Sequence, residues 1–491
     1  MKLTSTKLAI LFIVIFSTAG FCQQQGMTFD FYGGGARAEG MGYAFLAVSD
    51  DGTAGTWNPA GLYIHEKTMM TFSYGFFIPR GKFTFKEGQP ITATYDHTGS
   101  ISSLGFWNVI TPLRVKGHHI VANISYNRNF DIYYEFAENI GGAWTGDEPN
   151  ALFRKRGGVS SVDFALGARI YKELSFGISA NIYTGKTVTE ERRYFFRYGY
   201  KVDYGVPQLA SYEQNIAILD STTYSGFNTR IGFLYVADKI RAGLVLSTPF
   251  NLKVKSDSTI DRNSTEEGLE TTTTVSGTEF ATDIEYPYPK TAKIEIPLIV
   301  GLGLAYNINE NWLASADLEY KRFSGLKIHT LESFSYNASS NLTEVFSDNV
   351  DVPNWSNVFQ FRIGTEYLFN TKVGQVPVRA GFRKEVLPQG DIYSYEKVYK
   401  DEQADEFVNI NDNEPANVAK INYLFHYNQN QITGFSFSIG SGIYWSQILL
   451  DFAYTYTAYS QDIYEYASDP RYKSGNEWKN HHINLTFTGY F

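Results

Sequence analysis

The sequence predicts an all-β protein: a transmembrane antiparallel β-barrel of about fourteen strands with an N-terminal hatch inside its lumen. Three observations predict the barrel. Aromatic residues make up 16% of the chain, and Tyr, Phe and Trp favour strands. Several segments alternate strictly between apolar and polar residues, which is the period of a half-buried strand. Short turns and long polar stretches join successive strand candidates in alternation, as in transmembrane barrels.

Composition excludes several other classes of protein. The 491 residues carry a formal net charge of −9 and show no basic stripe, so we expect no nucleic-acid partner. After the first twenty residues, no apolar run approaches the roughly 20 residues that a membrane helix needs. The single cysteine excludes a disulfide scaffold.

The N-terminus predicts export. Lys2 and Lys7 form a positively charged region before an apolar run, Leu8–Phe16, and small residues follow up to Cys22. This is the arrangement of a secretory signal peptide, so we predict that residues 1–22 form one and that cleavage follows Cys22. Lipoprotein processing at Cys22 is the alternative, and it is disfavoured by the bulky Phe21 directly before it.

Three segments show the alternation most clearly. In 311–323, Trp312 and Leu318 fall on an apolar face and Asp317 on a polar one. The same pattern covers 357–369 and the last strand candidate, 477–491, which ends on Phe491. A soluble β-sandwich strand alternates in the same way, so a large soluble β protein stays open until the connections are considered.

The connections favour the barrel. Short turns join six pairs of strand candidates, and 67–78 and 477–491 add a first and a last strand. One of these turns is predicted at Thr111-Pro112-Leu113. The pairs are 99–110 with 117–136, 159–171 with 174–196, 222–236 with 240–255, 293–307 with 311–324, 357–369 with 376–387, and 433–445 with 447–466. The stretches between pairs are predicted to be loops: 137–157, 197–220, 256–290, 325–355, 388–431 and 467–476.

The segment before the first strand predicts the hatch. Residues 23–66 are dense in glycine, and we assign 67–491 to the barrel. A lumen inside about fourteen strands is too wide for side chains alone to fill, and Met41, Phe45 and Trp57 make the segment too apolar for a disordered leader. Candidate gating residues occupy its turns: Asp50, Asp51, Asn58, Pro59, Ala60 and Gly61.

Charged residues fall on the polar face of the predicted strands. Charges cannot face hydrocarbon without a cost, so we expect them to line the lumen and brace the hatch. Some of them, Arg379 especially, are candidates to contact the hatch or a ligand carboxylate; the simpler alternative is that they only pair with one another. The set is Asp317, Glu319, Lys321, Arg362, Glu366, Arg379, Arg383 and Asp451.

Signals for catalysis, metals or cofactors are weak, so we predict no enzyme activity, no metal site and no cofactor. The pairs His118-His119 and His481-His482 are adjacent on strands and therefore point to opposite faces. No G-x-S-x-G, P-loop or HExxH motif is present. The acidic stretch 401–414 could bind calcium, but its composition favours a solvated acidic loop. An outer-membrane hydrolase built on a similar barrel stays open as an alternative.

Several motifs resemble the FadL/TodX family of outer-membrane transporters. Gly35–Gly42 (GARAEGMG), Asp50-Asp51 and Asn58-Pro59-Ala60 are similar to the family's N-terminal hatch. Two further stretches are also similar: Arg362–Tyr367 with Val378–Phe382, and Asp451–Tyr456. The sequence departs from the family after Phe382, where Arg383–Pro388 leads into a long acidic insertion.

The resemblance implies a channel in the outer membrane of a Gram-negative bacterium. It would take up hydrophobic small molecules passively, of the long-chain fatty acid or aromatic hydrocarbon type, surrounded by outer-membrane lipid and lipopolysaccharide. In the family, a kink in the third strand opens the wall. Here that strand is 117–136, and its candidate positions are Asn127, Arg128 and Asn129. Arg128 falls on the apolar-facing register, which a kink or snorkelling would explain.

The resemblance leaves a second function open. Some barrels of this family are implied to act as protein-attachment or carrier components of a secretion system. The long stretches 256–290 and 388–431 would then meet a secreted-protein partner.

Overall fold

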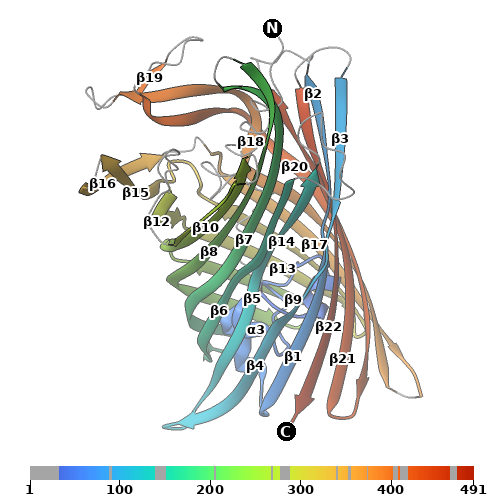
Figure 1. Ribbon diagram of the computed structural model, residues 1–491. Helices are drawn as coiled ribbons and strands as arrows, with labels where there is room; N and C mark the ends of the chain where they lie inside the picture. The colour runs from blue at the N-terminus through green and yellow to red at the C-terminus, as the bar shows by residue number, and fades with distance from the viewer. Residues whose placement is uncertain are drawn as a thin grey trace.

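The computed structural model describes residues 33–87, 91–138, 151–203, 206–266, 269–276, 288–338, 341–351, 355–372, 374–401, 407–409, 418–464 and 473–491. The strands wind around a common axis and form a closed barrel (Figure 1). The predicted signal peptide and the first ten residues of the predicted hatch lie outside the described residues.

Fourteen antiparallel strands close the wall, as the sequence predicted. Each pairs with the next, and the last pairs with the first from Met69↔Tyr490 to Ile78↔His481. In order around the wall, the strands are β1 (Met69–Ile78), β4 (Ile101–Val115), β5 (His118–Glu138), β6 (Ala151–Tyr171), β7 (Leu174–Asp203), β8 (Val206–Ala237), β9 (Ile240–Ser247), β13 (Ile299–Asn309), β14 (Trp312–Lys321), β17 (Val358–Asn370), β18 (Gln375–Asp401), β20 (Val418–Trp445), β21 (Ile448–Tyr464) and β22 (Lys473–Tyr490).

The two faces of the wall follow the alternation in the sequence. On β14, Leu318 is 44% exposed, whereas its neighbour Asp317 is 1% exposed. Asp317 lies directly opposite Arg362 of β17, and Leu318 lies opposite the exposed Phe361. Apolar side chains therefore face outward and polar ones inward, because only the interior offers them hydrogen-bond partners.

The long connections differ from the sequence-based expectation. Most of the predicted long loops contain paired strand, since β7 and β8 stay paired up to Asp203↔Val206, and β18 and β20 up to Asp401↔Val418. These hairpins extend beyond the wall at one end of the barrel, here called the hairpin end (Figure 1). The other strands found here are β2 (Arg80–Glu87), β3 (Ile91–Thr98), β10 (Phe250–Glu266), β11 (Leu269–Ser276), β12 (Tyr288–Ile296), β15 (Ile328–Ala338), β16 (Asn341–Asp351) and β19 (Phe407–Asn409).

The predicted turn at Thr111-Pro112-Leu113 is wrong. Strand β4 continues to Val115, and the chain turns at Lys116-Gly117, where both residues have positive φ. Pro112 is tolerated inside β4 because β1 stops pairing with β4 at Ile110. From there on, β4 pairs with β5 alone, and a proline without an N–H group fits such an edge.

Residues 33–64 lie inside the barrel and are here called the lumenal segment. It contains helix α2 (Ala36–Gly40), helix α3 (Ala54–Trp57) and the 3-10 helix η1 (Pro59–Ile64). These described helices have four to six residues, too few to serve as a membrane span. Helix η1 contacts β5, β6, β7 and β8, while α2 contacts β18, β20, β21 and β22.

Close approach between the lumenal segment and the wall depends on glycine at two positions. A Cβ at Gly177 of β7 would lie 2.2 Å from the carbonyl carbon of Pro59, and one at Gly381 of β18 would lie 2.0 Å from the backbone nitrogen of Gly42. Both distances are shorter than any van der Waals contact, so the wall has no room for a side chain there.

Candidate functional site

The wall is interrupted between β4 and β5. Their described pairing runs from Val115↔His118 to Phe106↔Asn127 and stops there. Beyond this point β4 pairs with β1 up to Ile101, and β5 pairs with β6 up to Glu138. Residues 101–105 and 128–133 therefore flank an opening in the wall, here called the window.

A β-bulge in β5 produces this interruption. The register with β6 shifts between Arg128 and Phe130, and a bulge bends its strand and increases its twist. Asn129 bonds Ser161, and Phe130 packs against buried apolar residues. Arg128 forms an ion pair of 2.6 Å with Asp131. Arg128, which the alternation of the sequence assigns to the apolar face, therefore lies in the window beside its counterion.

The window is narrow and bridged by side chains. The hydroxyl of Ser103 on β4 donates to Asp131 at 3.3 Å. Towards the hairpin end, a Cβ at Gly99 would meet the ring of Tyr133, so the two edges of the window approach one another there. The Arg128 guanidinium lies over Gly158 of β6, which has no side chain to obstruct it.

Behind the window lies a cavity of about 260 Å³. The lumenal segment forms one side of it through Gly33–Gly35, Glu39 and Tyr43. Strands β1, β4, β5, β18, β21 and β22 form the remainder. Aromatic rings line much of the wall side: Phe77, Phe130, Tyr133, Tyr459 and Trp478.

Charged groups in this cavity are paired. Glu39 of α2 lies 2.6 Å from Nδ1 of His482 and accepts from Nδ2 of Asn484 at 3.0 Å. Burial alone would raise the pKa of Glu39, but these contacts outweigh burial and hold the pKa below its usual range. Arg383 pairs with Glu385 and stacks over the ring of Tyr43 at 4.8 Å.

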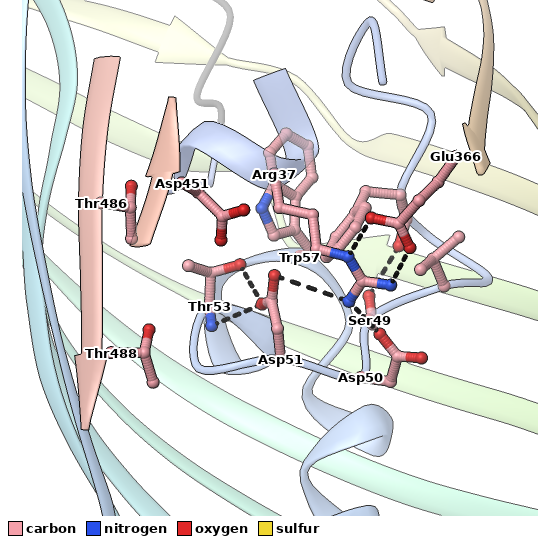
Figure 2. A network of polar contacts seen from close by, with 12 residues as sticks. Arg37, Ser49, Asp50, Asp51, Thr53, Trp57, Glu366, Asp451, Thr486 and Thr488 are labelled. Carbon is pink, nitrogen blue, oxygen red and sulfur yellow. Dashed lines mark hydrogen bonds and ion pairs between the residues drawn. The ribbon is translucent and has the colours of Figure 1, made fainter. Parts of the chain in front are cut away.

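A second polar network joins the lumenal segment to the wall (Figure 2). Arg37 donates to both carboxylate oxygens of Glu366, at 2.8 and 2.9 Å, and to Asp50 at 2.5 Å. Asp50 also accepts from Arg241 of β9 at 2.7 Å. Burial would raise the pKa of Asp50, but Arg37 and Arg241 hold the pKa well below its usual range.

The same network continues along the wall. Arg379 donates to Glu366 at 2.5 Å, to Asp451 at 2.6 Å and to the hydroxyl of Tyr444 at 2.8 Å. Glu366 thus lies between Arg37 of the lumenal segment and Arg379 of the wall. Such bidentate, buried arginine–carboxylate contacts constrain geometry strongly.

Two further contacts hold the backbone of the lumenal segment. A carboxylate oxygen of Asp317 accepts from the backbone nitrogens of Phe45 at 2.7 Å and Leu46 at 2.9 Å. The side chain of Asn58 accepts from Ala60 at 3.1 Å at the start of η1, where Pro59 is the first residue, and donates to the carbonyl oxygens of Leu46 and Phe233. Gly61 lies within η1. Asp51 accepts hydrogen bonds from the backbone nitrogen and the hydroxyl of Thr53.

The structure therefore divides the residues singled out from the sequence into groups. Asp50, Glu366, Arg379 and Asp451 belong to the Arg37 network. Glu319 and Arg362 form a separate wall ion pair of 3.1 Å, with Lys321 3.2 Å from Glu319. Of the window candidates, Arg128 and Asn129 line the cavity, and Asn127 marks the last β4–β5 pair.

Several residues of the cavity were missed by sequence reasoning, chiefly Glu39, Tyr43, Asp131 and His482. Glu39 lies inside the GARAEGMG motif, so the motif itself was a usable signal. The pairing of Glu39 with His482 joins residues 443 positions apart, and no local pattern announces it. His481, by contrast, lies beside Tyr454 at 2.7 Å, so the two adjacent histidines point apart as expected.

Metal binding receives no support from the described part of the chain, where no group of three His, Cys, Asp or Glu side chains is placed to hold an ion. Most of the acidic stretch 401–414 lies outside the described residues.

Comparisons with known proteins bear on the architecture through solved structures. A family model described as BamG matches residues 130–373. A search of curated proteins returned no match. Among solved structures, the Pseudomonas putida toluene transporter TodX matches at a TM-score of 0.54 and 12% identity, over 94% of this chain and 99% of that one. A Pseudomonas aeruginosa FadL homologue matches at 0.52 and 11%, over 94% and 99%.

The Ralstonia pickettii toluene transporter TbuX matches at a TM-score of 0.51 and 14% identity, over 94% of this chain and all of that one. These matches span nearly the whole of each chain. The chain therefore has the fold of the FadL/TodX family of outer-membrane transporters.

Proposed function

We propose that this protein is a passive outer-membrane channel for hydrophobic small molecules, which pass between its cavity and the membrane through the window. The observation that supports this most directly is the end of β4–β5 pairing at Phe106↔Asn127, beside the cavity. A backbone opening on the apolar outer face lets a hydrophobic molecule enter lipid without crossing the aqueous periplasm. The short-turn end then faces the periplasm, as in other outer-membrane barrels.

In this proposal, the lumenal segment acts as the hatch that closes the axial path. Its contacts with strands all around the wall support that role, as do the Arg37 network and the Asp317 and Asn58 contacts described above. Moving it out of the way would break several buried ion pairs at once, each costing about 3–5 kcal/mol when one partner is lost. Lateral passage needs no such movement.

Within this class of ligands, the cavity favours an uncharged aromatic molecule over a fatty acid. Its cations Arg128 and Arg383 each have a carboxylate partner, Asp131 and Glu385, and His482 is paired with Glu39. A fatty-acid carboxylate would have to displace one of these internal partners. The aromatic lining offers stacking and apolar contact that need no charge on the ligand.

A reversible cross-link across the window tests the proposal. Ser103→Cys with Asp131→Cys places one thiol on each edge, and the chain's single natural cysteine, Cys22, lies in the predicted signal peptide. Oxidation should abolish uptake of labelled toluene into vesicles that carry the protein, and reduction should restore it. Labelled oleate should be taken up more slowly in every state.

The matched control joins the same two strands where they are already paired. Val109 and Ile124 lie directly opposite one another below the window, so Val109→Cys with Ile124→Cys adds the same chemistry without closing the opening. Uptake that continues unchanged through the oxidised Ser103–Asp131 pair would refute lateral passage.

A second candidate function is attachment of a secreted protein. The paired ribbons that β7–β8 and β18–β20 project beyond the wall favour it, because β7–β8 pairing continues from Arg193↔Ile216 to Asp203↔Val206 after β6 has ended at Ala151↔Arg193. Deleting residues 197–214 should abolish cross-linking to secreted proteins under this alternative and leave toluene uptake unaffected.

A further inference from the structure

A continuous row of polar residues crosses seven neighbouring strands. It begins at Arg128 in the window and at Ser160, which is 4% exposed, and is exposed from Thr184 to Lys253. Each member lies directly opposite the next in the strand register, so the row follows the hydrogen-bonded rungs from β5 to β15. Its members are Arg128, Ser160, Thr184, Ser225, Lys253, Lys293 and His329.

The end of this row is basic and faces outward. Lys253 of β10 lies opposite Lys293 of β12, which lies opposite His329 of β15. Their chain neighbours Leu252, Val254 and Ile294 are 1% exposed and belong to the interior apolar cluster. Because successive strand residues point to opposite faces, the two lysines and the histidine point away from that cluster.

Like charges directly opposite on antiparallel strands destabilise the sheet. Among the described residues, no carboxylate lies within ion-pair distance of Lys253 or Lys293, while Glu295 contacts His329 at 3.3 Å and Asp257 contacts Lys255 at 3.6 Å. The exposed Lys327 and Arg322 follow on the turn after β14. We call Lys253, Lys255, Lys293, Arg322, Lys327 and His329 the basic patch.

The basic patch stands out against the rest of the protein. It carries five lysine or arginine side chains against the two carboxylates Asp257 and Glu295, in a chain whose net charge is −9. A local excess of positive charge attracts an anion from outside.

Its position on the barrel indicates which anion. The outward apolar residues end next to the patch: Phe227, two positions after Ser225 on β8, is 56% exposed, and Leu298, just after β12, is 39% exposed. The patch lies on the side of these residues that leads to the hairpin end. A ligand held here would therefore place acyl chains on the apolar belt and its anionic head on the lysines.

We propose that the basic patch binds the phosphate groups of lipid A in the outer leaflet. This rests on the outer-membrane location and orientation in the proposed function, but not on transport. Lys253 and Lys293 contact the phosphate directly, and the hydroxyl of Ser225, which lies opposite Lys253, offers a donor beside it. An amphiphile bound to the wall in this way fills the outer surface between β8 and β15.

Lipid retention by the full-length protein tests the proposal. The double variant Lys253→Gln, Lys293→Gln is compared with the wild type for affinity towards diphosphoryl lipid A in phosphatidylcholine nanodiscs. At about 1 kcal/mol for each lysine near a membrane surface, the variant should bind at least tenfold more weakly. Heat-modifiable gel mobility should be unchanged, since both lysines lie outside the core.

Three comparisons make the result decisive. The matched control Lys239→Gln, Lys372→Gln removes two exposed lysines at the short-turn end and should retain lipid A like the wild type. Removing both phosphates from lipid A should weaken binding to the wild type as much as the patch variant does. Equal binding of phosphatidylglycerol at the same phosphate density, or equal lipid A affinity in wild type and patch variant, would overturn the assignment.

The outcome is independent of the proposed transport activity. A protein that retains lipid A through the patch but shows no toluene uptake would support the patch and refute the channel. Toluene uptake by a protein whose patch does not bind lipid A would support the channel and refute the patch.

Discussion

Arg37 of the lumenal segment and Glu366 of strand β17 form a bidentate ion pair, with distances of 2.8 and 2.9 Å. The side chain of Glu366 is 5% exposed and also accepts from Arg379. One wall carboxylate therefore holds the lumenal segment and the barrel together, and its neutralisation should separate them.

Glu366→Gln should loosen the lumenal segment without unfolding the barrel. The change leaves Arg37 and Arg379 with a neutral partner in a buried position, which should cost about 3–5 kcal/mol of anchoring. We expect a higher ion conductance in planar bilayers and unchanged heat-modifiable gel mobility. Glu477→Gln, which changes an exposed carboxylate of β22, should conduct like the wild type; equal leakage in both variants would count against the anchoring role.

The turn at Asn58 should also control closure. The double variant Asn58→Ala, Pro59→Ala removes the side-chain contacts to Ala60, Leu46 and Phe233 together with the proline that begins η1. Losing such a capping residue costs about 0.5–2 kcal/mol. The barrel should fold, while toluene uptake changes and small-ion leakage rises. Wild-type uptake and conductance in a folded double variant would show that this segment does not act as a hatch.

Adjacent residues of β14 should differ in their effect on assembly. Leu318→Arg places a charge on the lipid-facing side and should cost about 2–4 kcal/mol if it lies near the membrane midplane. Asp317→Asn should be milder for the wall, because Asp317 faces inward and an amide can still accept from Phe45 and Leu46. Urea unfolding in vesicles measures both, and equal losses would refute the assigned faces.

Acid should weaken the hold of Asp50 only well below neutral pH. Its pKa in the folded protein is lowered by Arg37 and Arg241, so the stabilisation is present above the pKa of the unfolded chain and is lost as pH falls through the lowered folded value. Conductance should therefore stay constant from pH 7 to about 5. Asp50→Asn should leak at pH 7 as well; leakage that appears only in acid in this variant would exclude Asp50 as the group responsible.

Much of the wall could be predicted because its signal is local. Alternation of period 2 assigned Leu318 outward and Asp317 inward, and the even set of strand candidates predicted fourteen strands, all of which the structure confirms. Prediction failed at Pro112 and in the stretches 197–220 and 388–431. In the two stretches, polar residues form paired ribbons whose alternation lacks an apolar face. At Pro112, the edge of a strand tolerates a proline that would end an internal strand.

The sequence by itself determined which wall residues face outward and which face the interior, because hydrophobic periodicity is local to the chain. It also predicted that residues 23–66 are too apolar for a disordered leader. Only the tertiary structure decided that β4 and β5 part at Phe106↔Asn127, that Glu39 meets His482, and that Lys253, Lys293 and His329 share one row. These relationships depend on the register between strands and on contacts between residues far apart in the chain. Register is set by the closure of the whole barrel, so no segment carries it alone.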